Sequence, residues 1–149
     1  MPIGEFATRD VITAPRQASV LDVAKLMRKH HVGDIVVTDE IGGRNVPAGI
    51  VTDRDIVLET LAQDVDPERV SAGDIMTQEL VTVKESDGVF GAIELMRATG
   101  TRRAPVVDPQ GALTGIISVD DLVGLLAEEL SAVSKLISRE QKQEVATRR

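Results

Sequence analysis

The sequence predicts a mixed α/β (α+β) fold made of two β-α-β-β-α repeats related by a pseudo-twofold axis. Three observations lead to this expectation. The second half of the chain repeats the first half, each half alternates helical faces with short apolar runs, and both halves end on the same small polar motif. A duplicated unit that carries a duplicated polar motif indicates two related ligand sites on one scaffold.

The internal repeat has a constant spacing over most of its length. Matching residues lie 69 positions apart, as Thr13 and Thr82 do, as far as the hairpin of each copy, which is three residues longer in the first copy. The spacing then becomes 66. The matched residues of the first copy are Gly4, Thr8, Thr13, Val20, Leu26, Met27, Arg28, Val37 and Asp39, and those of the second are Gly73, Thr77, Thr82, Val89, Leu95, Met96, Arg97, Val106 and Asp108.

The elements of each copy follow from hydrophobic periodicity. A short helix is expected at 3–8 and at 72–77. The next helix has an apolar face in both copies, formed by Val20, Val23, Ala24 and Met27 and by Val89, Ala92, Ile93 and Met96. Apolar runs closed by turn residues predict buried strands at 34–39, 46–51, 104–108 and 112–117. Thr52 and Ser118 then begin helices.

The segment between the copies is acidic. Six acids and the single base Arg69 lie between Glu59 and Glu79, and Pro67 interrupts the segment, so we expect an exposed linker. The predicted division is therefore repeat 1 at 1–63, a linker at 64–70, repeat 2 at 71–130 and a C-terminal extension at 131–149. In that extension an apolar stripe continues the last helix, and the polar tail from Gln141 is expected to fray.

Composition excludes several classes of protein. The 149 residues carry a net charge of −7, 1% aromatic residues and no cysteine. These values argue against a nucleic-acid binder, a disulfide scaffold and a thiolate site. No apolar run is long enough to span a membrane or to act as a signal peptide, so we expect a soluble cytoplasmic protein without a membrane partner.

The polar motif that ends each copy has two interpretations. Thr52 with Asp55, and Ser118 with Asp121, place a hydroxyl and a carboxylate at the start of a helix. There a phosphate could lie against free backbone N–H groups while the carboxylate holds the hydroxyls of a ribose. The same spacing also fits an ordinary helix N-cap. Both interpretations can hold at once.

From about residue 4 to 127 the chain resembles a tandem pair of cystathionine-β-synthase (CBS) domains, also called a Bateman module. No single matching segment is specific, but two ordered copies of the set are. The segments are Asp74-Ile-Met-Thr77, His31-Val-Gly-Asp-Ile-Val-Val37, Arg102-Arg-Ala-Pro-Val-Val-Asp108, Gly49-Ile-Val-Thr-Asp-Arg-Asp55 and Gly115-Ile-Ile-Ser-Val-Asp-Asp121.

The resemblance implies a regulatory module that binds an adenine nucleotide (AMP, ADP or ATP) or a related adenosyl ligand such as NAD or S-adenosylmethionine. Asp55 and Asp121 would hold the ribose, and Thr52 and Ser118 would lie near the phosphate. The adenine would lie between the segment around the first strand and the middle strand of a copy. The residues implied there are Thr13, Ala14 and Pro15 with Ile35 and Val36 in copy one, and Thr82 and Val83 with Ala104 and Pro105 in copy two. Asp34, which precedes Ile35, is also expected among the ligand-binding residues.

The two copies differ in their charged residues. The middle strand of copy two opens with Arg102 and Arg103, where related modules often place basic residues on phosphates, although a solvated surface pair is the alternative. Within the motif, copy one has Arg54 where copy two has Asp120. We therefore expect the cleft of Thr52, Arg54 and Asp55 to be the better nucleotide site, with Arg102 or Arg103 serving the opposite cleft.

No catalytic constellation or metal-binding motif stands out in the sequence, so we expect no enzymatic activity and no obligatory cofactor. Three hypotheses remain: a nucleotide sensor, a Mg²⁺-responsive module that uses the acidic linker, and a structural dimerisation adaptor with empty clefts. The apolar stripe of the last helix predicts a homodimer formed through the CBS modules and that helix, with a downstream protein partner that the sequence does not identify.

Overall fold

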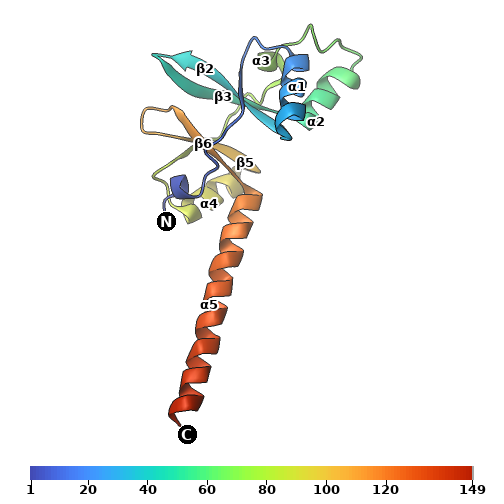
Figure 1. Ribbon diagram of the computed structural model, residues 1–149. Coiled ribbons are helices and arrows are strands. Elements are labelled where there is room, and N and C mark those ends of the chain that lie inside the picture. The colour runs from blue at the N-terminus through green and yellow to red at the C-terminus, as the bar shows by residue number, and fades with distance from the viewer. Residues whose placement is uncertain (149) are drawn as a thin grey trace. The chain divides into compact units, whose positions relative to one another are not determined.

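The computed structural model describes residues 1–148, which divide into two compact units, Met1–Ile117 and the segment that begins at Ser118. The first unit contains two three-stranded sheets, one in each sequence repeat, with strand orders β1-β2-β3 and β4-β5-β6 (Figure 1). The second unit is the long helix α5 (Val119–Thr147). The predicted α+β class is confirmed.

The first repeat contains the predicted elements in the predicted order. They are η1 (Ile3–Glu5), β1 (Thr13–Pro15), α1 (Val20–His30), β2 (Asp34–Ile41), β3 (Arg44–Thr52), α2 (Asp53–Ile56) and the π-helical turn η2 (Val57–Leu61). β1 pairs with β2 in parallel, and β2 pairs with β3 in antiparallel fashion. The second pairing places Asp34 opposite Thr52 at the end of the hairpin.

The second repeat has the same order of elements. They are α3 (Ala72–Ile75), β4 (Val83–Lys84), α4 (Val89–Thr99), β5 (Arg103–Val107) and β6 (Leu113–Ser118), followed by α5. β4 pairs with β5 in parallel, as β1 does with β2. The helical faces are also confirmed, because the buried residues of α1 and α4 recur at matching positions: Val20, Val23 and Met27, and Val89, Ala92 and Met96.

The short helix that precedes each repeat packs on the other repeat. Ala72 of α3 donates its N–H to Ala18, and the matching Ile3 of η1 donates its N–H to Asp87. Ala72 and Met76 belong to the buried core of the first repeat, together with residues of α1, β2 and β3. The two repeats are therefore joined by a reciprocal exchange of their leading segments.

This exchange corrects part of the linker prediction. Residues 64–66, 68 and 69 are exposed as expected, but Ala72 is fully buried and Met76 is 5% exposed. Thr60, inside the acidic segment, is also buried and donates its hydroxyl to the carbonyl oxygen of Ile56. The apolar residues after Arg69 are drawn into the core because they cover the first sheet.

Helix α5 begins at the predicted position and extends further than expected. The tail from Gln141 was predicted to fray, yet the helix continues to Thr147, so that prediction is wrong for the described residues. Good helix formers from Arg139 to Glu144 and an Arg148–Glu144 ion pair of 2.8 Å favour the last turns. Across residues 1–148, no helix is long and apolar enough to cross a membrane.

Candidate functional site

The two polar motifs both form complete capping boxes. In the first copy the Thr52 hydroxyl accepts the N–H of Asp55 at 3.1 Å, and the Asp55 carboxylate accepts the N–H of Thr52 at 2.9 Å. Ser118 and Asp121 repeat this arrangement. A third box, formed by Ser71 and Asp74, begins α3, which lies outside both motifs. The capping interpretation is confirmed, and a capping box by itself does not identify a ligand site.

The backbone of the first motif is already hydrogen-bonded. The N–H of Asp53 donates to the carbonyl of Gly33 at 2.9 Å, and that of Arg54 donates to the Asp53 carboxylate at 2.8 Å. The N–H of Asp55 is held by Thr52. The expectation of free N–H groups for a phosphate is therefore wrong in this copy, because the chain itself supplies three acceptors. Anion binding there would depend on side chains.

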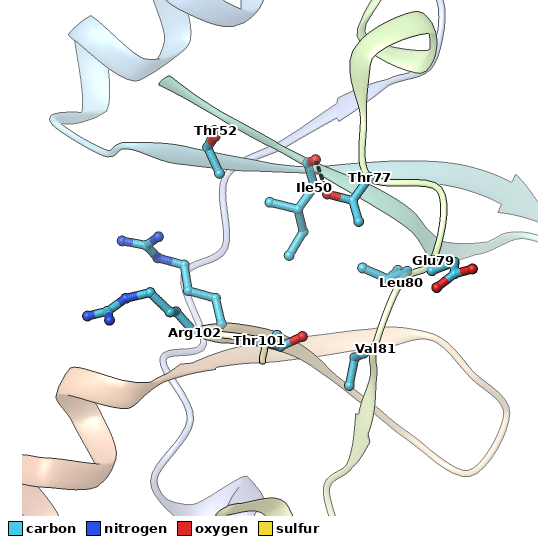
Figure 2. A pocket seen from close by; sticks show the side chains of 9 residues that line it. Ile50, Thr52, Thr77, Glu79, Leu80, Val81, Thr101 and Arg102 are labelled. Atoms are coloured by element: carbon cyan, nitrogen blue, oxygen red, sulfur yellow. Dashed lines mark hydrogen bonds between the residues drawn. The ribbon is translucent and has the colours of Figure 1, made fainter. Parts of the chain in front are cut away.

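A pocket of about 260 Å³ lies where the two repeats meet. We call it the central pocket; its lining residues are Ile50, Thr52, Thr77, Glu79, Leu80, Val81, Thr101, Arg102 and Arg103. Figure 2 shows Ile50 and Thr52 on one repeat facing Thr101 and Arg102 on the other, with Leu80 and Val81 on the segment between α3 and β4. The N–H and hydroxyl of Thr77 both donate to the carbonyl of Ile50, which fixes that segment against β3.

The two arginines of the central pocket differ in their partners. Arg103 forms an ion pair with Asp34, with 3.4 Å between Nε and Oδ1, whereas no carboxylate of residues 1–148 lies within ion-pair distance of Arg102. Burial raises the pKa of the Asp34 carboxyl, the charge of Arg103 opposes this rise, and the nearby Asp53 adds to it. The pocket thus combines three threonine hydroxyls, the carboxylate of Glu79, one arginine without a carboxylate partner in residues 1–148 and one arginine held by a partly buried acid.

The matching positions of the other copy carry different charges. Gly33 and Asp34 stand at the positions of Arg102 and Arg103, and Asp10 stands at that of Glu79. The sequence equivalent of the central pocket therefore has two acids and no arginine. Because a phosphate group is an anion, the difference favours the copy that contains Thr52.

The structure brings together only some of the predicted site residues. Thr52, Arg102 and Arg103 line the central pocket, and Asp34 and Asp55 are bonded to residues that line it. Thr13, Ala14 and Pro15 line a separate pocket with Thr38 to Glu40. Ala14 is also a core residue that is 3% exposed, and the other predicted site residues in the core, each less than 4% exposed, are Ile35, Val36, Val83, Ala104 and Pro105. Arg54, Thr82, Asp120 and Asp121 are exposed, and Ser118 is half-buried.

Six residues of the central pocket were missed by the sequence reasoning. They are Ile50, Thr77, Glu79, Leu80, Val81 and Thr101. Thr77 did carry a signal, since it belongs to the repeated pair of Thr8 and Thr77 and ends a matching segment. The segment after it shows no polar pattern, so its position at the pocket becomes visible only once α3 is seen on the first repeat.

Comparisons with known proteins agree with this architecture. The CBS domain family model matches twice, at residues 3–61 and 72–128. An uncharacterized protein of Methanopyrus kandleri is 40% identical over 121 residues, which are 81% of this chain and 60% of that relative. This chain therefore spans less than two thirds of the relative's length.

Two solved structures share the fold. A hexameric CBS-CP12 protein from bloom-forming cyanobacteria is 34% identical, with a TM-score of 0.71 over 83% of this chain and 69% of that one. A CBS domain pair in complex with 5′-methylthioadenosine and S-adenosyl-L-methionine is 26% identical, with a TM-score of 0.73 over 87% of this chain and 98% of that one. The chain belongs to the CBS domain family and contains a tandem CBS pair, a type of regulatory ligand-binding module.

Proposed function

We propose that this protein is a regulatory module that binds an adenine nucleotide in the central pocket. The observation that carries the proposal is the meeting of Thr52 from one repeat with Arg102 and Arg103 from the other in one pocket. A hydroxyl and two guanidinium groups can bind a phosphate through charge-assisted hydrogen bonds. The bound phosphate would join the two repeats.

The remaining parts of a nucleotide have matching surfaces. Ile50, Leu80 and Val81 form an apolar wall that suits the face of a purine. The Asp55 carboxylate uses Oδ2 for its cap, and no hydrogen bond from residues 1–148 occupies Oδ1. Oδ1 is therefore available to accept from the ribose hydroxyls. The predicted adenine contacts on the middle strands would use backbone groups, since those side chains are buried.

The charge of the pocket favours a phosphorylated ligand. Arg102 is exposed and has no carboxylate partner within the described residues, so it attracts AMP, ADP or ATP more than it attracts S-adenosylmethionine, whose sulfonium is positive. NAD remains a candidate because it contains an AMP half. A related CBS pair binds S-adenosyl-L-methionine, which supports an adenosyl ligand for this protein. That complex does not distinguish a phosphorylated ligand from one without a phosphate.

Regulation would follow from differential binding. A ligand held by both repeats favours the arrangement in which Thr52 and the arginines face each other, and a partner protein can respond to that change of population. Calorimetric titration of the protein with AMP, ATP, NAD and S-adenosylmethionine tests the proposal. Micromolar binding of a phosphorylated ligand that is lost in Asp55→Ala supports it, and the absence of binding by all four contradicts it.

A second role, homodimerisation, is favoured by α5. Leu130, Val133 and Ile137 are 72%, 53% and 52% exposed and lie on one face of the helix. Such a face is typical of a helix that packs on another helix. We propose that two copies associate through it, which is compatible with nucleotide binding. The alternative Mg²⁺-responsive role stays a hypothesis: residues 1–148 contain no group of three acidic or histidine side chains placed to hold a metal ion, but Mg²⁺ often binds through only one or two carboxylates.

A further inference from the structure

Asp34 and Arg103 occupy equivalent positions of the two repeats and contact each other. Each is the first residue of the middle strand of its sheet, and they lie 69 positions apart. Contact between equivalent residues places the pair at the pseudo-twofold axis. The ion pair therefore bridges the two repeats beside the residues that would hold the phosphate.

The contact leaves Arg103 incompletely bonded. Its Nε lies 3.4 Å from Asp34 Oδ1, and no hydrogen bond joins its guanidinium to residues 1–148. Arg16 and Asp39 show a saturated pair in the same molecule, with hydrogen bonds of 2.7 and 3.0 Å. Arginine binds planar or multiply charged anions best through two parallel hydrogen bonds. Arg103 thus has donors to offer to a second anion.

Asp34 would lose its main electrostatic support if Arg103 turned toward a ligand. Its side chain is only 16% exposed, and the neighbouring Asp53 carries a second negative charge. A partly buried carboxylate without a cation is unfavourable. A phosphate that takes Arg103 must therefore compete with Asp34, while an uncharged adenosyl ligand makes no such demand.

We propose that Asp34 is a specificity-determining residue, which competes with the ligand's phosphate for Arg103 and so lowers the preference of the central pocket for phosphorylated ligands. This inference rests on the proposed function. It assigns different roles to the two arginines: Arg102 has no competing carboxylate within residues 1–148, whereas Arg103 offers its remaining donors to the phosphate against the attraction of Asp34.

The test compares AMP with adenosine, which lacks the phosphate, by calorimetry on the full chain. Asp34→Asn keeps the shape of the side chain and removes its charge. It should tighten AMP binding roughly three- to tenfold, the size of a partly exposed charge interaction, and leave adenosine binding within twofold. Asp39→Asn is the matched control, since Asp39 pairs with Arg16 outside the central pocket, and it should change neither affinity.

A double variant separates this mechanism from a general change in charge. If Asp34 acts through Arg103, Asp34→Asn should give no tightening when Arg103→Gln is also present. Should Asp34→Asn fail to fold, Arg103→Gln alone gives the test: it should weaken AMP less than Arg102→Gln does. An equal or larger loss at Arg103 would overturn the competition.

The outcomes distinguish the inference from the proposed function. If the wild-type protein binds neither AMP nor adenosine, the proposed function fails and the inference fails with it. If both ligands bind and Asp34→Asn leaves their affinity ratio unchanged, the competition is wrong while the nucleotide site stands. If Asp34→Asn changes the ratio of AMP to adenosine affinity even when Arg103→Gln is present, the proposed competition for Arg103 is also overturned. Asp34 would then act through some other group.

Discussion

Met76 packs directly against Gly49. A Cβ atom on Gly49 would lie 2.6 Å from the Met76 sulfur and 2.7 Å from its Cγ. Met76 follows α3, the leading helix of the second repeat, whereas Gly49 lies on β3 of the first. The glycine that opens the repeated motif therefore leaves room for a segment of the other repeat. A Cβ atom on Gly115, its equivalent, would lie 3.0 Å from both the Ala7 Cβ and the Thr8 carbonyl oxygen.

This close approach predicts that Gly49→Ala destabilises the fold. The added methyl must displace Met76 from a packed core, which costs about 1–3 kcal/mol. Urea denaturation measures the loss. Gly91→Ala is the control, because Gly91 lies inside α4 with nothing within 4 Å of its Cβ position, and alanine there should stabilise the helix by up to about 1 kcal/mol. Equal effects of the two substitutions would contradict the packing role of Gly49.

The capping boxes allow helix stability to be separated from ligand binding. Asp55→Ala should lower AMP affinity about tenfold or more, as expected when a charged hydrogen-bond acceptor is removed. Asp74→Ala breaks the same type of box at α3, away from the central pocket lining, and should leave affinity unchanged. Asp121→Ala should have a smaller effect than Asp55→Ala. The ranking of the two clefts is wrong if Asp121→Ala abolishes binding and Asp55→Ala spares it.

Arg102 should distinguish ligands by their phosphate. Arg102→Gln removes a cation that has no carboxylate partner within residues 1–148. We expect at least fivefold weaker AMP binding and little change for adenosine, because only the phosphate loses a charge-assisted bond. Competition titrations against a fluorescent AMP analogue measure both. A parallel loss for adenosine would show that Arg102 contacts the nucleoside or supports the fold instead.

Acid stability should depend on Asp39. Its hydrogen bonds and charge interaction with Arg16 lower the pKa of the Asp39 carboxyl in the folded state. The resulting stabilisation is complete above the unfolded pKa of about 3.9 and is lost as the pH falls through the lower folded value. Asp39→Asn should therefore lose less stability than the wild type between about pH 4 and pH 2.5. Denaturation curves with the same pH dependence would contradict this.

The Asp34 carboxyl should change the stability of the fold with pH in the opposite direction to Asp39. Burial raises the pKa of its carboxyl, so its contribution to stability decreases as the pH rises from the unfolded value through the folded one. Asp34→Asn should remove this decrease. The same denaturation series, extended to pH 7, measures this decrease in stability. The raised pKa would be contradicted if the stability of Asp34→Asn fell more steeply over this range than that of the wild type.

Helix α5 should carry the association of two copies. Replacing Val133 and Ile137 by glutamate places charges on the exposed apolar face and should halve the mass seen in sedimentation. Glutamate at Ser131 and Ser138 is the control, because both serines are already polar and exposed. An unchanged sedimentation coefficient in the Val133/Ile137 variant would exclude this helix as the interface. A hexamer, as in the cyanobacterial relative, would be seen directly in the wild type.

Most of the fold could be predicted because the repeat and the hydrophobic periods are local signals. The spacing of Thr13 and Thr82, and the faces of α1 and α4, fixed the order of elements. The exchange of leading segments could not be predicted in this way. Ile3 and Ala72 present the same pattern whether each packs on its own repeat or on the other, so local sequence does not distinguish the two arrangements.

The candidate site was predicted less completely for the same reason. Thr52 was found from the repeated polar motif, and the arginines from a position that related modules often fill with basic residues. The segment 77–81, by contrast, reaches the pocket only because α3 crosses to the first repeat. Similarly, the N–H groups at the start of the helix after Thr52 were expected to be free, yet Gly33, just before β2, places its carbonyl 2.9 Å from the N–H of Asp53. Tertiary contacts decided both points.

The most direct test of nucleotide binding in the central pocket is calorimetric titration of the full chain with AMP, in the wild type and in Asp55→Ala. We predict micromolar binding at one strong site in the wild type, weakened at least tenfold in the variant. Titration heats that are absent in the wild type, or that are the same in both proteins, would contradict a nucleotide site built on Thr52, Asp55 and the two arginines.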